Sequence, residues 1–237
     1  MSALIKFNIA YYINSAKYLI PLLFFGGFLV VNFQTAPIDI WGNLHLTSIA
    51  IFVFASMVSA TLIASEDKTQ LYITLLHTKN ETKYHLSKIL SAKITLVLFY
   101  FITVVFPIIG GHFPRQLTLP EIAVYLIVYF LVGLLGVALG VIFTDRIFPR
   151  EVAFLGHIIA IVIVAVPLHV VFSDIGFLTY VYYLLPPIHF LADEMHNLGE
   201  GTLVMDGNFI IFVVSSIIYS IALTIIYCVA TSTRIKR

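Results

Sequence analysis

The chain has 237 residues, of which 60% are hydrophobic and 11% are charged, and its mean hydropathy is +1.03. Soluble domains carry about 25% charged residues, so a water-soluble core cannot hide this much apolar surface and the composition predicts an integral membrane protein. The net charge of +1 argues against nucleic acid as a partner. A single cysteine, Cys228, excludes disulfides and cysteine metal sites within one chain.

The N-terminal residues 1–17 are predicted to form an amphipathic helix and not a cleavable signal peptide. Asn8, Asn14 and Lys17 interrupt any short apolar core there. The apolar residues follow helical spacing, which is typical of a helix lying in the inner membrane interface. This stripe consists of Ile5, Ile9, Tyr12, Ile13 and Ala16. The helix is either an anchor or an element that moves during a transport cycle.

Six stretches without charged residues are long enough to cross a bilayer. A hydrocarbon core about 30 Å thick needs roughly 20 apolar residues in a helix, and a central charge costs about 2.5–3.5 kcal/mol on insertion scales. The sequence therefore predicts an all-α membrane protein in which residues 1–237 form a single six-span transmembrane domain. The stretches are 18–38, 40–65, 94–114, 122–144, 152–173 and 207–233.

A seventh charge-free stretch, 175–192, is interpreted as a re-entrant hairpin or interfacial helix. Pro186 and Pro187 remove two consecutive backbone donors, and only Asp174 separates the stretch from the fifth span. Its tyrosines are typical of a membrane interface. We expect residues 173–207 to form an extracellular re-entrant segment, which is either a gate or a lid over the helix ends.

Positive charge predicts that both termini lie in the cytoplasm. With six spans, every lysine and arginine except Arg115 falls on the inner side, as the positive-inside rule requires. A seventh span would place Arg234, Lys236 and Arg237 outside. The charge distribution therefore supports six spans.

The longest inner loop, 66–93, is predicted to form two helical pieces. Glu66 and Asp67 are acidic residues of the kind that favour a helix N-terminus. Apolar residues then recur at i, i+4 spacing and give a short helix an apolar face. These residues are Leu71, Tyr72, Leu75 and Leu76. Thr78 with Glu81 matches a capping box, which starts a second helix leading into the third span.

An exposed apolar face at the cytoplasmic surface has two explanations. It can dock a protein partner, because exposed apolar patches on short helices are common recognition surfaces. It can instead rest on the lipid surface as an amphipathic loop.

The sequence lacks the common catalytic and cofactor motifs. No GxxxxGK[ST] phosphate loop, HExxH, CxxC or GxSxG occurs, so we expect no nucleotide site, no metal, no cofactor and no catalytic residue in this chain. Ionisable or helix-breaking residues in or near the spans are candidates for a pathway or gate; these are His157, His169, Pro186 and Pro187. Small residues of the fourth span permit close helix packing, namely Gly133, Gly136 and Gly140.

Together, these features resemble the membrane subunit of a type-2 ABC transporter. The amphipathic N-terminal helix, six spans, charged loop after span two and Pro-Pro segment before span six follow the family's order. Within the loop, an acidic residue precedes a short helix, and Leu75-Leu76 and Thr78 are followed by basic residues leading to span three. Leu-Leu-His-Thr stands where family members often have a proline and an arginine.

The resemblance implies that residues 66–93 contain a coupling helix seated on a cytoplasmic ABC ATPase. Two copies of that ATPase would bind ATP and magnesium, and a second permease, identical or a sibling, would complete the pathway across the lipid bilayer. The residues implied in ATPase coupling are Glu66, Asp67, Leu71, Tyr72, Leu75, Leu76 and Thr78.

Aromatic spans without fixed charge suit an amphipathic or lipophilic cargo. Small family members resemble bacterial exporters of peptide toxins and antimicrobial peptides, such as the permeases for phenol-soluble modulins, while export of lipid-linked glycans or drugs is the alternative. The bias towards Ile, Phe, Tyr, Lys and Asn is typical of a low-GC Gram-positive bacterium, which implies a bacterial cell membrane.

Two other classes of function stay open. An intramembrane protease would place a serine of one span opposite His157 or His169. A non-transporting anchor or sensor subunit would need the apolar face of the 66–93 loop but no pathway.

Overall fold

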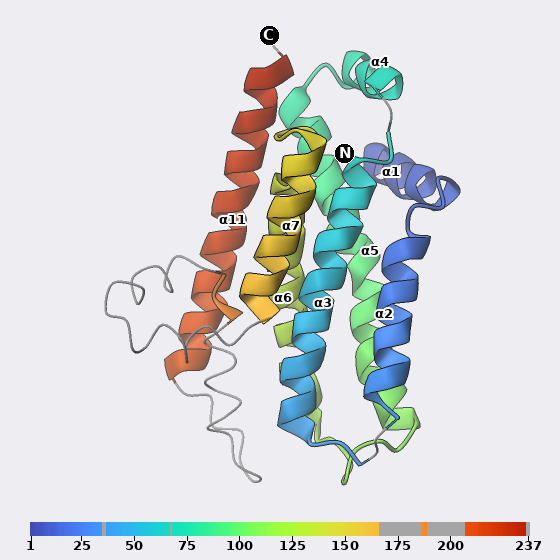
Figure 1. Cartoon of the computed structure of the whole chain (residues 1–237), viewed down its shortest axis with the longest axis vertical. Helices are drawn as coiled ribbons and strands as arrows, with labels where there is room; N and C mark the ends of the chain where they lie inside the picture. Colours follow the sequence, from blue (N-terminus) through green and yellow to red (C-terminus); the bar gives the residue numbers. More distant parts are fainter. Residues whose placement is uncertain (35–36, 67, 166–185, 189–206, 236–237) are drawn as a thin grey trace.

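The computed structural model describes residues 1–34, 37–66, 68–165, 186–188 and 207–235, and within them every regular element is a helix (Figure 1). Asp67, His169 and most of the predicted re-entrant segment lie outside the described residues. The helices are α1 (Ser2–Asn14), α2 (Leu19–Asn32), α3 (Ile40–Ile63), α4 (Lys68–Thr78), α5 (Glu81–Ile109), α6 (Leu119–Ile142), α7 (Arg150–Ala165) and α11 (Gly207–Ile235).

The predicted all-helical fold is confirmed in the described part of the chain, and its long apolar helices are compatible with a membrane protein. Four of its helices, α3, α5, α6 and α11, are long and apolar enough to cross a bilayer. The pair α1 and α2, bent by 76°, adds a fifth if the two helices are counted as one span. The described part of α7 has 16 residues.

The helices stand side by side as a bundle whose two ends differ (Figure 1). One end carries α1, α4, the beginning of α7 and the last turn of α11, and we call it the α4 end. The α2–α3 and α5–α6 connections lie at the opposite end. There, Arg115 forms an ion pair of 2.6 Å with Glu121, and this hydrogen-bonded pairing raises the pKa of Arg115.

The centre of the bundle is the contact between α3 and α6. A Cβ atom on Gly136 would overlap the carbonyl oxygen of Phe52, and one on Gly140 would overlap that of Ser56. These two glycines therefore let the backbones of α3 and α6 approach closely within one chain. Gly133 instead faces Tyr100 of α5.

The N-terminal helix α1 packs against the bundle through polar as well as apolar side chains. Asn8 and Tyr12 are buried, whereas Ile13 is 55% exposed. Tyr12 shares a hydrogen bond of 2.7 Å with Thr61 of α3, and Lys17 donates one of 2.6 Å to the carbonyl oxygen of Ala64. Polar partners, which hydropathy spacing does not register, decide which side of α1 faces the bundle.

The junction between α4 and α5 also differs from the predicted capping box. α4 ends at Thr78, whose hydroxyl donates to the carbonyl oxygen of Thr74 at 2.7 Å. Lys79 then adopts a positive φ of 53°. Asn80 becomes the N-cap of α5 and accepts a hydrogen bond of 2.8 Å from the Lys83 N–H. The cap lies two residues later than predicted because the chain turns at Lys79.

We predict that Gly140→Ala lowers the free energy of unfolding in detergent by about 1–3 kcal/mol, because the added methyl group meets the backbone of α3. Gly27→Ala in α2 is the matched control, since a Cβ there meets no atom within 4 Å. It should be neutral or stabilise by about 0.5–1 kcal/mol. Equal effects of the two substitutions in chemical unfolding would contradict the close α3–α6 contact.

Candidate functional site

A buried ion pair lies where the chain leaves α3 and enters α4. Lys88 Nζ of α5 is 2.8 Å from Glu66 Oε1, and at most 1% of either side chain is exposed. The hydroxyl of Tyr84 donates a hydrogen bond to Oε2 of Glu66, and Lys88 Nζ lies 5.8 Å from the centroid of the Tyr84 ring. Arg146 donates a hydrogen bond of 3.2 Å to the carbonyl oxygen of Glu66. We call these four residues the Glu66 cluster.

Burial makes the geometry of this ion pair decisive. Each charge loses several kcal/mol of hydration when it leaves water, and only a close partner with further hydrogen bonds offsets that cost. Glu66 has both, because one carboxylate oxygen meets Lys88 and the other accepts from Tyr84. The pair therefore specifies where Glu66, three residues after the end of α3, must lie, and with it the start of α4.

One turn of α5 joins the cluster to the rest of the α4 end. His85 and Tyr227 of α11 are linked by a hydrogen bond of 3.2 Å. Ser87 accepts a hydrogen bond of 3.0 Å from the side-chain amide of Asn8 in α1. Tyr84 and Lys88, on the same turn, hold Glu66. This stretch of α5 thus contacts α1, α11 and the α3–α4 connection through polar side chains.

The structure separates the predicted coupling residues into two groups. Glu66 is buried against α5 and lies before α4, which begins at Lys68, so it is not an acidic residue of the first helical turn. Leu71 is buried and Leu75 is half-buried. Tyr72 and Leu76 are 59% and 75% exposed.

An apolar surface remains open on α4. It consists of Tyr72, Ile73 and Leu76, at i, i+1 and i+4, and we call it the α4 face. α4 lies apart from the helical bundle at its end (Figure 1), and the side chains of the α4 face are 45–75% exposed. A helix with one side packed through Leu71 and Thr74 and the other side open can dock a second protein.

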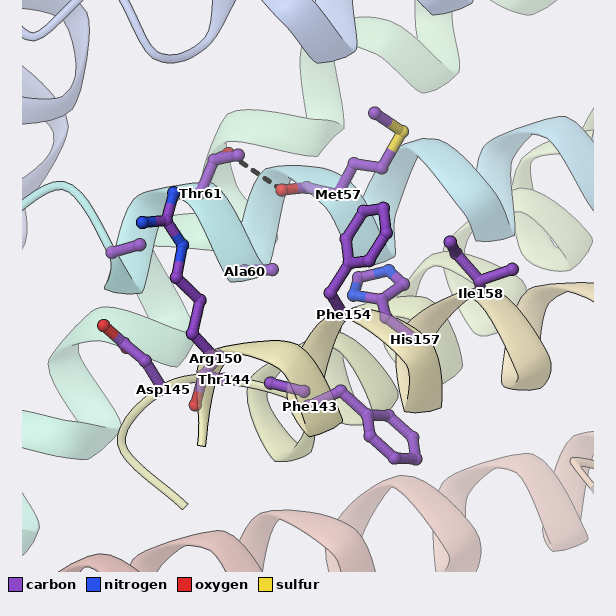
Figure 2. Close-up of a pocket in the computed structure, with 12 residues that line it drawn as sticks. Met57, Ala60, Thr61, Phe143, Thr144, Asp145, Arg150, Phe154, His157 and Ile158 are labelled. Atoms are coloured by element: carbon purple, nitrogen blue, oxygen red, sulfur yellow. Dashed lines mark hydrogen bonds between the residues drawn. The ribbon is translucent and has the colours of Figure 1, made fainter. Parts of the chain in front are cut away.

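His157 takes part in a contact between α3 and α7. Its Nε2 atom lies 2.8 Å from the Ser56 hydroxyl, and Ser56 is fully buried. The histidine also lines a cleft of about 460 Å³ between α3, α7 and the α6–α7 connection, which we call the α3–α7 cleft (Figure 2). The cleft is lined mainly by apolar side chains, with Asp145 and Arg150 at the α4 end.

The other candidate gate residues are only partly described. Pro186 and Pro187 are buried, and Ile188 after them belongs to the hydrophobic core. His169 and Asp67 lie outside the described residues. Across the ranges that the structure describes, no group of three or more His, Cys, Asp or Glu residues is arranged to hold a metal ion.

Sequence reasoning did not detect the partners in the Glu66 cluster. Glu66 and Lys88 are 22 positions apart, one in the α3–α4 connection and the other on α5, and periodicity within one helix cannot pair them. The available signal was chemical: few charges occur in this chain, and a buried charge needs a counter-charge.

Comparison of the chain with protein-family models, with curated proteins and with solved structures finds no match.

We predict that Glu66→Gln or Lys88→Met alone lowers the free energy of unfolding by about 3–5 kcal/mol, because each leaves an unpaired buried charge. The double variant should recover part of that loss, since neither charge then remains buried. A double-mutant cycle from chemical unfolding in detergent measures the coupling.

Glu121→Gln is the control for this cycle. It also breaks an ion pair, but the Arg115 side chain that it leaves is 46% exposed and stays hydrated. Its loss should be smaller than that of Glu66→Gln. Single-variant losses that simply add in the double variant would show that Glu66 and Lys88 do not depend on each other.

Proposed function

We propose that the chain is the permease subunit of an ATP-driven type-2 ABC exporter in a bacterial cell membrane. The observation that supports this most directly is the α4 face, an apolar surface of Tyr72, Ile73 and Leu76 on a short helix. The connection that leads into this helix is held inside the bundle by the ion pair between Glu66 and Lys88. A docking helix whose connection to α3 is fixed by an ion pair can transmit a movement of the partner to the membrane spans.

The proposed partner is a cytoplasmic ABC ATPase, present in two copies. The sequence has no phosphate loop, so in this proposal ATP and magnesium bind to that partner. The loop 66–93 resembles the coupling segment of the family, and the α4 face is the part of it that a groove on the ATPase would receive. The α4 end would then face the cytoplasm, together with both termini.

Force on α4 has a direct route into the bundle. Glu66 joins α4 to the end of α3, and its carboxylate is held by α5. The same turn of α5 bonds to α1 and α11 through Ser87 and His85. A displacement of α4 would therefore move α3 and α5 together, because pulling Glu66 away from Lys88 exposes two charges to an apolar interior.

The finer topology of the proposal comes from the sequence. Six spans require that α7 continues to about residue 173 and that α1 lies in the membrane interface before α2. Residues 173–207 would form the extracellular re-entrant segment. A second permease, identical or a sibling, would complete the pathway. An amphipathic peptide, such as a peptide toxin or antimicrobial peptide, is the proposed cargo, and lipid-linked glycans or drugs are the alternatives.

We predict that Leu76→Asp weakens binding of the proposed ABC ATPase partner by at least about tenfold, because it places a charge in the apolar α4 face. The measurements are the affinity of the two purified proteins in detergent and the ATP hydrolysis of the complex in liposomes. The helical content of the permease should not change.

Leu119→Asp is the matched control. Leu119 is 80% exposed, like Leu76, but it begins α6 at the opposite end of the bundle. The same substitution there should leave ATPase binding unchanged. Normal binding and hydrolysis by the Leu76→Asp variant would contradict the coupling role of α4.

One contact favours a second candidate function, an intramembrane hydrolase. Ser56 and His157 lie on different helices with Oγ and Nε2 2.8 Å apart, which is the spacing of a nucleophile and its general base. Ser56 is nevertheless fully buried, and its carbonyl oxygen packs against Gly140. A substrate would have to separate α7 from α3 to reach the hydroxyl, so the bond is better suited to hold α7 against α3.

Ser56→Ala separates the two functions. In an exporter it removes one interhelical hydrogen bond, and ATP hydrolysis by the reconstituted complex should persist. The expected cost is about 0.5–1.5 kcal/mol of stability. In a hydrolase the same change removes the nucleophile, and cleavage of every substrate should stop. Loss of a measured peptidase or esterase activity on this substitution would overturn the exporter proposal.

A further inference from the structure

The polarity of the side chains that line the α3–α7 cleft differs between its two ends. Its deeper part is walled by apolar side chains, and its α4 end is bordered by two opposite charges, Asp145 and Arg150 (Figure 2). The apolar wall includes Met57, Phe143, Phe154 and Ile158. A ligand that fills the cleft must therefore be amphipathic, with a polar head at the α4 end and an apolar tail towards the middle of the bundle.

The two charges at the mouth are available to a ligand. Asp145 and Arg150 are both exposed. Within the described ranges the ion pairs are Glu66–Lys88 and Arg115–Glu121, so neither residue at the mouth is paired with the other or with another charged side chain. A carboxylate and a guanidinium held apart at one opening complement a head group that itself carries both signs of charge.

The volume and position of the cleft suit a lipid chain. About 460 Å³ is within the range of about 300–1,000 Å³ found for small-molecule sites. Phe154 and Ile158, on its α7 wall, are 65% and 43% exposed. In a helix that borders the bilayer, such side chains face acyl chains and not water.

We propose that the α3–α7 cleft binds a zwitterionic phospholipid with a primary ammonium head group, of the phosphatidylethanolamine type. Its phosphate meets the guanidinium of Arg150, a planar donor suited to phosphate oxygens. Its ammonium donates to the carboxylate of Asp145, and one acyl chain lies along Phe154 and Ile158. This binding site does not depend on the proposed transport function, because a lipid can occupy the cleft in any membrane protein of this fold.

The choice among head groups follows from Asp145. An anionic phospholipid without an ammonium would also place its phosphate at Arg150, but it would leave the carboxylate of Asp145 without a positive partner. A choline head group carries the positive charge but has no N–H to donate. A primary ammonium supplies both the charge and the hydrogen bonds.

Tryptophan fluorescence can report occupancy of the cleft. Trp41 is the only tryptophan of the chain, so Trp41→Phe removes the background signal and Phe154→Trp places a reporter in the cleft wall. The protein is reconstituted in phosphatidylcholine with increasing fractions of acyl-brominated phosphatidylethanolamine, phosphatidylcholine or phosphatidylglycerol. The bromine atoms quench nearby tryptophan, and the curves yield relative binding constants.

The ethanolamine lipid should bind at the reporter in position 154 roughly fivefold more strongly than the choline or glycerol lipid, as one charge-assisted hydrogen bond permits. Asp145→Asn should reduce this ratio to about one, and Asp145→Glu should retain it. Arg150→Gln should weaken all three phospholipids relative to brominated diacylglycerol, which has no phosphate.

A second reporter separates a specific site from ordinary lipid contact. Ile218 of α11 is 63% exposed, close to the 65% of Phe154, and Ile218→Trp in the Trp41→Phe background should show no head-group preference. Equal quenching by the three lipids at position 154 would overturn the proposal. So would a preference that persists in Asp145→Asn, or the same preference at both reporters. Circular dichroism verifies that each variant retains its helical content.

Discussion

The ion pair between Glu66 and Lys88 is the constraint that organises the α4 end of this protein. Two charges that are almost completely buried must stay together, because separating them leaves each without hydration or a counter-charge. Tyr84 and Arg146 add hydrogen bonds to Glu66. The path of the chain from α3 into α4 is thereby tied to one turn of α5, and α4 is held at a defined place outside the main core.

The bundle combines one tight contact with one loose contact around the same helix. Gly136 and Gly140 let α6 approach the backbone of α3, which buries most of that side of α3. On another side, α3 and α7 are separated by a cleft and joined by the Ser56–His157 hydrogen bond. A rigid α3–α6 unit beside a weakly attached α7 gives the fold a place where helices can separate or admit a ligand without disturbing the centre.

Polar residues account for the places where the sequence-based expectations and the structure differ. Amphipathic spacing predicted an interfacial helix at residues 1–17 but gave no sign that Asn8 of α1 is buried through its bond to Ser87. Glu66 matched a helix start by its local sequence, but Lys88 draws it into the interior. Each of these contacts joins residues that are far apart in the sequence, which periodicity in a single segment cannot reveal. The candidate site was therefore located by the sequence in its α4 part and missed in its α5 part.

The sequence alone determined that this protein is suited to a lipid environment and that its secondary structure is helical. Long charge-free stretches can satisfy their backbone groups in lipid only as helices, so an all-helical membrane protein follows from composition and spacing. The tertiary structure decided which helices touch and how their few polar groups are paired. In the tertiary structure α6 packs closely on α3, Glu66 is buried against Lys88, and a cleft lies between α3 and α7. Such contacts depend on how helices that are far apart in the sequence are placed relative to one another. Hydrophobicity indicates that a helix is buried in lipid or protein, but it does not indicate which other helix it packs against.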